Sequence, residues 1–506
     1  MSITGSIFKN IFSCWIYYFI QLLVGFFLTP FMVHRLGNEL YGVWILTLTM
    51  SGYMGILDFG IRGSVVKYVA EFEAKKDFKT LNSVINSSLF IHLIAGLLTI
   101  IITLVASNFL SYFFKIRPEF IQDFKLCFII VGFNLSISLT LSIFGGILEG
   151  HKRVDIVSGI ELFSFILQSS TIAFCVLNGY GIVVLALSIF IISIFKHIIR
   201  FAAVYRLCGY LKLRLYLVNK KTLKLIFSYS SLLFIFNSLR GFISSLPNII
   251  LGIFLGPIAI TFYSIASRLV GYCITFLFTA STIFVPFISS FEASNDIERL
   301  SKSFTKGSKY TYMIMLFLVT ILLFMGAPFI RLWMGEQFVK ESYGILFILS
   351  IIFVLCPSYF IIESLLKGLG RLKEICFLVI IEMIFGIILS TILVKRYGAI
   401  GVAIGLSLPQ VINYGIILLI FVSNIFKINF REYIRETIAP LLFPTIALVC
   451  TLLLFKSRLY PNNYLLLFVE FLLSGLLYFG LCFKFTLSPY ERDFYLSKLR
   501  LFSGKR

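Results

Sequence analysis

The chain has 506 residues, of which 59% are hydrophobic and only 13% are charged. A mean hydropathy of +0.99 excludes an ordinary soluble domain, because a water-exposed surface needs far more charged side chains. The net charge of +21 does not indicate nucleic-acid binding, because the basic residues lie mainly in alternate loops, which is the pattern that membrane topology produces.

Long apolar stretches predict membrane-spanning helices from one end of the chain to the other. The first run is too long for the apolar part of a signal peptide and has no small-residue cleavage site. About 20 apolar residues cross a roughly 30 Å hydrocarbon core. The predicted spans are 11–33, 40–60, 84–106, 124–148, 156–177, 181–205, 225–253, 258–288, 310–330, 343–366, 375–394, 398–425, 438–456 and 464–485. The fold class is therefore all-α, a polytopic membrane protein of about fourteen transmembrane helices.

The loop charges predict the orientation of these spans. An even number of spans places both termini on one side of the membrane. If that side is the cytoplasm, 30 of the 44 Lys and Arg residues lie in cytoplasmic segments and nine lie in the opposite loops. This bias predicts cytoplasmic termini. The larger cytoplasmic loops are basic and are expected to lie along anionic membrane lipids.

Short matches recur at an offset of about 217 residues. They pair Pro30 with Pro247, 148–153 with 366–371, and Tyr180-Gly181 with Tyr397-Gly398. Six spans separate the members of each pair, so the two halves would share one orientation, an architecture of transporters with the substrate site between the halves. The predicted organisation is a six-helix bundle over 1–205, a second over 206–426, and two extra helices with a cytoplasmic tail over 427–506.

Three basic residues inside spans are candidate substrate ligands. Arg240 lies about fifteen residues into the seventh span and Arg268 about ten residues into the eighth, so both are near the membrane midplane. An arginine there costs roughly 2.5–3.5 kcal/mol on insertion scales and tends to face water or an anion. Its planar guanidinium suits phosphate oxygens, although pairing with a carboxylate or carbonyls is the alternative. Lys196 would extend a cationic lining, or its long stem would reach the interface.

Acidic residues near the inner ends of spans are candidates for gating or ion coupling. Asp58 and Arg62 flank the inner end of the second span, either as a helix-end ion pair that holds a gate or as a proton or sodium site. Glu363 is chosen because Pro357 breaks its helix nearby. Three further glutamates, which are Glu149, Glu161 and Glu382, could balance an arginine or titrate.

No metal or catalytic site is predicted. The nine cysteines are scattered through the spans without a CxxC pair, and the four histidines show no ligand spacing. Walker-type and G-x-G-x-x-G motifs are absent, which excludes a nucleotide site of those kinds.

A resemblance to a known family rests on several short segments. They are Pro30, Arg35-Leu36-Gly37, Leu40-Tyr41-Gly42-Val43-Trp44, Leu57-Asp58-Phe59-Gly60 and Lys67-Tyr68, with Gly256, Tyr263, Ala266 and Arg268-Leu269 further on. The pattern resembles the bacterial polysaccharide flippases, the Wzx type of the multidrug/oligosaccharidyl-lipid/polysaccharide (MOP) exporter superfamily. Many relatives carry an acidic residue near the position of Asn248, and this chain does not, which argues against a cation-coupling site there.

The resemblance implies a function in polysaccharide biosynthesis. The chain would translocate undecaprenyl-pyrophosphate-linked oligosaccharide units, for the O-antigen of lipopolysaccharide or another surface polysaccharide, across the inner membrane by alternating access through a cationic cavity. No bound cofactor is expected, and coupling to protons, sodium or the membrane potential is left open. Expected partners are the lipid-linked oligosaccharide, membrane lipids, a polysaccharide polymerase and a chain-length regulator.

Two other functions compete with the flippase interpretation. A drug or cation exporter of the same superfamily would favour an acidic, aromatic cavity, whereas the deepest charges in this chain are basic. A membrane polysaccharide polymerase or glycosyltransferase needs catalytic groups, commonly on a sizeable external loop, and the external loops here are short. The sequence therefore predicts a transporter and not an enzyme.

Overall fold

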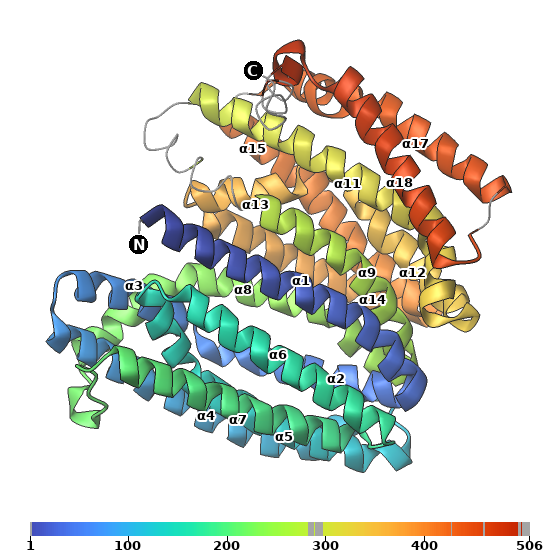
Figure 1. Cartoon of the computed structure of the whole chain (residues 1–506). Helices are drawn as coiled ribbons and strands as arrows, with labels where there is room; N and C mark the ends of the chain where they lie inside the picture. Colours follow the sequence, from blue (N-terminus) through green and yellow to red (C-terminus); the bar gives the residue numbers. More distant parts are fainter. Residues whose placement is uncertain are drawn as a thin grey trace. The chain divides into compact units, whose positions relative to one another are not determined.

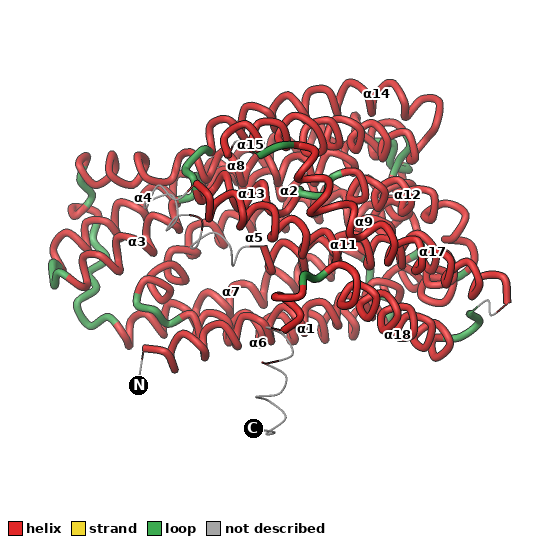
Figure 2. Tube along the Cα trace, turned by 90° about the horizontal axis from the view of Figure 1, so that it is seen from above, coloured by secondary structure: helices red, strands yellow, loops and turns green. Residues whose placement is uncertain are grey.

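The computed structural model describes residues 3–281, 288, 297–426, 428–458, 461–493 and 497. The chain forms two compact units, Met1–Thr261 and Phe262–Arg506. Figures 1 and 2 show helices throughout the described residues and no strand. The predicted all-α class is confirmed.

The first unit is built from long helices and two short 3₁₀ turns. They are α1 (Ile3–Leu36), α2 (Asn38–Met54), η1 (Gly55–Asp58), α3 (Ile61–Ala74), α4 (Phe78–Phe113), α5 (Pro118–Gly150), α6 (Val154–Leu177), α7 (Ile182–Leu207), η2 (Leu215–Leu217) and α8 (Lys220–Phe254). Buried side chains at helical spacing, Ile61 and Val65, place α3 against Leu81 of α4 and Ile147 of α5. This packing anchors the short helix that follows η1.

The second unit begins within α9 (Pro257–Ser281). Its other elements are α11 (Ile297–Met334), α12 (Glu336–Leu355), α13 (Tyr359–Gly368), α14 (Leu372–Val411), the π-helical η3 (Ile412–Ile417), α15 (Leu418–Phe426), α16 (Phe430–Tyr433), the π-helical η4 (Ile434–Ile438), α17 (Ala439–Arg458), α18 (Tyr464–Leu481) and the π-helical η5 (Cys482–Thr486). A buried cluster joins Tyr312 and Leu316 of α11 to Leu448 of α17 and Tyr478 of α18. The two last long helices therefore pack on α11.

Thirteen helical segments of the described residues are long and apolar enough to cross a membrane. One of them, 372–426, combines two predicted spans. Gly398 interrupts it with a φ of 57° and a ψ of −138°, a conformation that glycine adopts without a Cβ clash. Dividing the segment there recovers the fourteen predicted helices. The end of predicted span 258–288 lies partly outside the described residues.

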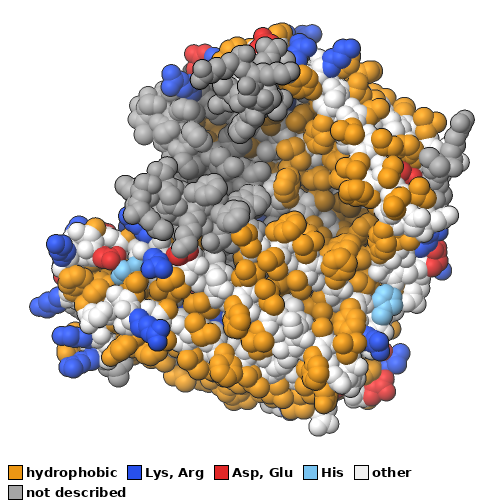
Figure 3. Space-filling view, in the orientation of Figure 1, with side chains coloured by type: hydrophobic (Ala, Val, Ile, Leu, Met, Phe, Trp, Pro, Cys, Tyr) orange, Lys and Arg blue, Asp and Glu red, His pale blue; other side chains and the backbone are white. Residues whose placement is uncertain are grey.

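The surface agrees with a lipid environment. On the face in Figure 3, hydrophobic side chains dominate, and Lys and Arg gather near the edges. Leu97 and Phe109 of α4 are both more than half exposed, which water would disfavour and hydrocarbon does not. The chain is a multi-pass membrane protein.

One pair of matched segments of the predicted repeat has the same local backbone. In the turns of 148–153 and 366–371, three consecutive N–H groups donate to the carbonyls four, three and five residues earlier, at 2.9–3.2 Å. Each turn has one left-handed residue at the matched position, Lys152 (φ 60°) in the first and Gly370 (φ 66°) in the second. The two six-helix bundles themselves stay a prediction, because the compact units divide at Thr261 and α8 packs against α2, α3 and α4.

Candidate functional site

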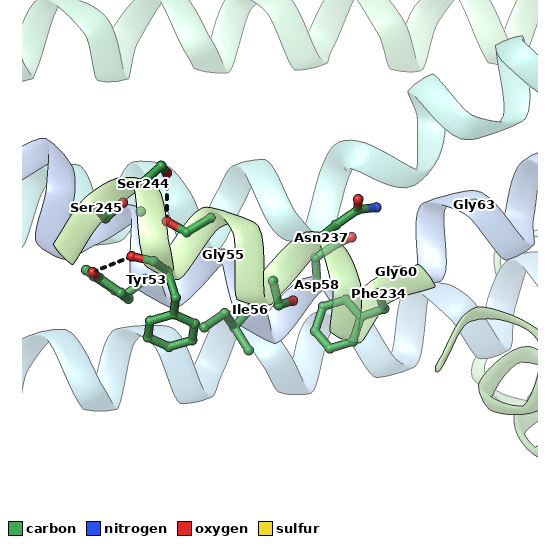
Figure 4. A pocket seen from close by; sticks show the side chains of 14 residues that line it. Tyr53, Gly55, Ile56, Asp58, Gly60, Gly63, Phe234, Asn237, Ser244 and Ser245 are labelled. Atoms are coloured by element: carbon green, nitrogen blue, oxygen red, sulfur yellow. Dashed lines mark hydrogen bonds between the residues drawn. The ribbon is translucent and has the colours of Figure 1, made fainter. Parts of the chain in front are cut away.

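A polar cleft of about 580 Å³ lies in the first unit, between α8 on one side and α2, η1 and α3 on the other (Figure 4). Hydroxyl and amide groups reach it from Tyr53, Asn237, Ser238, Ser244 and Ser245, and a carboxylate from Asp58. Five glycines line it, which are Gly52, Gly55, Gly60, Gly63 and Gly241, together with Ile56, Phe234 and Phe242. No Lys or Arg is among its lining residues in the described part of the chain. The cleft therefore combines apolar walls with several polar groups and has no cationic side chain among its described lining residues.

The Leu57-Asp58-Phe59-Gly60 segment forms one wall of the cleft. The 3₁₀ turn η1 ends at Asp58, and the next two residues have left-handed backbones, Phe59 with φ 47° and Gly60 with φ 67°. A left-handed phenylalanine is uncommon, because its Cβ crowds the backbone. The two residues redirect the chain from α2 into α3 and leave Asp58 at the bend.

Asp58 is held by a histidine that the sequence analysis did not select. His92 Nε2 of α4 lies 3.1 Å from Asp58 Oδ1, and the histidine side chain is fully buried while Asp58 is 31% exposed. The predicted ion pair between Asp58 and Arg62 at the helix end is wrong, because Asp58 pairs with His92 and Arg62 pairs with another carboxylate. The bend at 59–60 separates the two residues into different helices, so their four-residue spacing does not bring them together.

Arg62 instead pairs with Glu149 across α3 and α5. Arg62 Nη2 lies 2.6 Å from Glu149 Oε1. Two glycines of α5 make room for the arginine stem, since an added Cβ would lie 3.2 Å from Arg62 Nη2 at Gly145 and 3.3 Å from Arg62 Cγ at Gly146. The pair links two helices of the first unit. A gating role of Arg62 stays a prediction.

Lys196 belongs to a second ion-pair group of the first unit. Its Nζ lies 3.7 Å from Glu161 Oε2, and Arg200 pairs with the other oxygen of the same carboxylate. Arg200 is only 2% exposed, so Glu161 compensates a buried charge. The sequence offered Glu161 as a possible counter-charge but did not assign it to Lys196 and Arg200.

The two deepest arginines belong to different units. The guanidinium carbon of Arg240, on α8, lies 5.7 Å from the ring centroid of Phe236. Arg240 is not among the residues that line the cleft. Arg268 lies on α9 in the second unit and is half-buried. Their joint contact with one anion stays a prediction.

Two carboxylates of the second unit contact the π-helical segment η3. Glu363, 2% exposed, accepts a hydrogen bond from the Tyr414 hydroxyl at 2.9 Å and lies 3.5 Å from Lys367 Nζ. Glu382 accepts from Asn413 Nδ2 at 2.6 Å. The break expected near Glu363 is confirmed, because α12 ends at Leu355 and α13 begins at Tyr359, on either side of Pro357. A coupling role of Glu363 stays a prediction.

Sequence reasoning missed His92, Asn237, Asn413 and Tyr414. A lone polar residue in an apolar span carries no sign of its partner, and π-helical turns, which are frequent at functional sites, have no simple sequence pattern. The spacing of Asn237, Gly241 and Ser245, each four residues apart, was the one available signal of a polar face on α8.

The comparisons with known proteins place the chain in a family. The model of the family described as polysaccharide biosynthesis protein matches residues 41–343, more than half of the chain. The chain belongs to this family. A protein named "Putative O-antigen transporter" from Shigella flexneri is 22% identical over 418 residues, which are 82% of this chain and 96% of that protein.

Solved structures show the same fold. The lipid II flippase MurJ in an inward closed conformation has a TM-score of 0.72 at 17% identity, covering 92% of this chain and 97% of its own. An inward-facing MATE multidrug transporter of the MOP superfamily has a TM-score of 0.69 at 15% identity, covering 80% and 95%. The family match and the O-antigen transporter relative confirm the predicted resemblance to Wzx-type polysaccharide flippases, and the solved structures share the fold. The named relatives are transporters and not enzymes.

Proposed function

We propose that the chain translocates undecaprenyl-pyrophosphate-linked oligosaccharide units, of O-antigen or another surface polysaccharide, across the bacterial inner membrane. The observation that carries the proposal is the polar cleft within the spans of a member of a polysaccharide biosynthesis family. A glycan head group loses its hydrogen bonds to water inside a bilayer, and unmade hydrogen bonds of buried polar groups are costly. A cleft with hydroxyl, amide and carboxylate groups replaces those bonds, while the polyprenyl tail stays in lipid.

The pyrophosphate is assigned to Arg240 and Arg268. Charge-assisted hydrogen bonds from guanidinium groups to phosphate oxygens are strong and bidentate. Lys196 is a weaker candidate, because an anion there would compete with Glu161, which lies 3.7 Å from its ammonium. The cationic cavity is thus limited in this proposal to the two arginines.

The cycle proposed is alternating access with both termini in the cytoplasm. The ion pair of Arg62 and Glu149 and the pair of Asp58 and His92 link neighbouring helices, so they are suited to breaking and re-forming as helices move. Glu363 is the candidate for proton or sodium coupling. A negative interior also favours outward movement of the anionic head group, by roughly 2.3 kcal/mol per charge per 100 mV.

Complementation of a deletion strain tests this function. The strain would express the wild type, or Arg240→Ala with Arg268→Ala, at matched membrane amounts. We expect the wild type to restore surface glycan and the double variant to accumulate lipid-linked units inside. Arg396→Ala is a matched control, because this arginine also lies over a ring, 5.5 Å from that of Tyr397, at the predicted outer end of a span.

Each contrary outcome removes a specific part of the proposal. Normal surface glycan in the deletion strain would contradict the proposal that the chain transports lipid-linked units. The alternative would then be a drug or cation exporter of the same superfamily. Full rescue by the double arginine variant removes the two arginines as pyrophosphate ligands and leaves the transport function in place.

A further inference from the structure

Four glycines of the cleft have no packing reason to be glycine. Among the described residues, a Cβ added at Gly52, Gly55, Gly63 or Gly241 would meet no atom within 4 Å, and none of the four has a positive φ. At Gly42, in contrast, the added Cβ would lie 2.0 Å from the Pro257 carbonyl oxygen, and at Gly150 it would lie 2.7 Å from Val69. Glycine weakens a helix relative to alanine. These four glycines keep the cleft open, because any side chain at their positions would extend into its volume.

The groups around this volume match a neutral polyhydroxyl ligand. Asn237 offers two donors and an acceptor, and each serine offers one donor and two acceptor positions. Asp58 adds a carboxylate, with His92 on its Oδ1 atom. Figure 4 shows Asp58 and Asn237 toward one end of the cleft and Tyr53 and Ser245 toward the other.

Aromatic rings complete the lining. Phe234 lies beside Gly60 in the view of Figure 4, and the rings of Tyr53 and Phe242 are 4.6 Å apart between centroids. Ring faces pack against apolar surfaces such as the C–H face of a sugar. A pyrophosphate would instead require cations, which the lining lacks among the described residues.

We propose that this cleft binds the uncharged sugar residues of the transported head group, apart from the arginines that bind its pyrophosphate. The inference rests on the proposed function and adds the part of the substrate that the first unit recognises. The glycines set the size of glycan that the cleft admits, and Asn237 and Asp58 bond its hydroxyl groups.

Filling the cleft tests the inference in the deletion strain. Gly241→Leu adds bulk without a clash at Cβ with the described residues, and Gly159→Leu on α6 is the matched control, because an added Cβ there also meets none of their atoms within 4 Å. At matched membrane amounts we expect Gly241→Leu to lower surface glycan at least tenfold and to accumulate lipid-linked units, while Gly159→Leu behaves as wild type. If Gly241→Leu is not recovered in the membrane, Asn237→Leu, at an exposed position of α8, replaces it.

A second arm varies the glycan. Deleting the glycosyltransferase that adds the second sugar leaves a lipid-linked unit with one sugar, and an impermeant lectin on spheroplasts measures its exposure outside. We expect Gly241→Leu to export this short unit at the wild-type rate, because the short head group leaves the added bulk room. Arg240→Ala should impair export of both the short and the full unit, because both carry the pyrophosphate.

Two outcomes would overturn the glycan assignment alone. One is full surface glycan with Gly241→Leu. The other is an equal block of short and full units, which would mark a general structural defect. Failure of the proposed function is distinguished from both, because the deletion strain without any plasmid would then accumulate no lipid-linked units.

Discussion

Two groups of carboxylates, one in each unit, have different kinds of partner. In the first unit, cations and carboxylates pair across helices: Arg62 with Glu149, and Lys196 and Arg200 with Glu161. In the second unit, Glu363 and Glu382 have a tyrosine hydroxyl and an asparagine amide of one π-helical segment among their partners. This difference indicates that removing a carboxylate from an ion pair of the first unit leaves a cation without its counter-charge. Removing a neutral hydrogen-bond donor from Glu363 or Glu382 should lower the free energy of unfolding by less.

The largest effect is expected from Glu161→Gln. The change leaves Arg200, which is almost fully buried, without its carboxylate, and breaking a buried pair from one side costs about 3 kcal/mol. Thermal unfolding of the protein in detergent measures the loss. Glu119→Gln is the control, because its pair with Arg117 is more than half exposed on both sides and such pairs contribute little. An unchanged melting temperature for Glu161→Gln would contradict the charge-balance account.

Tyr414→Phe tests the hydrogen bond to Glu363 in the second unit. It removes the hydroxyl that donates to Glu363 at 2.9 Å and keeps the ring, so we expect a loss of about 1 kcal/mol, typical of one hydrogen bond. The same melting assay measures it, with Tyr490→Phe at an exposed position as the control. A loss as large as that of Glu161→Gln would contradict the difference between the two groups of carboxylates.

The last prediction is a pH dependence and concerns Glu491, which follows the last span. Burial raises the pKa of this carboxyl, but hydrogen bonds from the Ser488 N–H and the Tyr310 hydroxyl and the ammonium of Lys309 outweigh it and lower the pKa from 4.5 to about 2. A depressed folded pKa stabilises the protein above the unfolded value, and this contribution is lost as the pH falls from about 4.5 toward 2. The melting temperature of the wild type should therefore approach that of Glu491→Gln as the pH falls through this range. Parallel curves down to pH 2 would contradict the assignment.

Much of the fold follows from local properties of the sequence. A run such as 84–106 is apolar over the length of a bilayer, and α4 contains it whole. Pro357 lacks a backbone donor, and the helix breaks where it stands. Gly398 was expected at a boundary between two spans and supplies the non-helical backbone there.

The candidate site was predictable only in part. Asp58, Arg62, Lys196 and Glu363 are polar residues in apolar surroundings, and that alone drew attention to them. Their partners were not visible, because Asp58 meets His92 from 34 residues away and Arg62 meets Glu149 from 87 residues away.

The sequence by itself determined the number of spans, their positions and the presence of charges among them, because span length and hydropathy are properties of short segments. The tertiary structure alone decided which charges pair and where the cleft opens. Those features depend on how α8 packs on α2 and α3 and on which faces of distant helices meet. Because no short segment carries that information, the glycine-lined cleft became visible only in three dimensions.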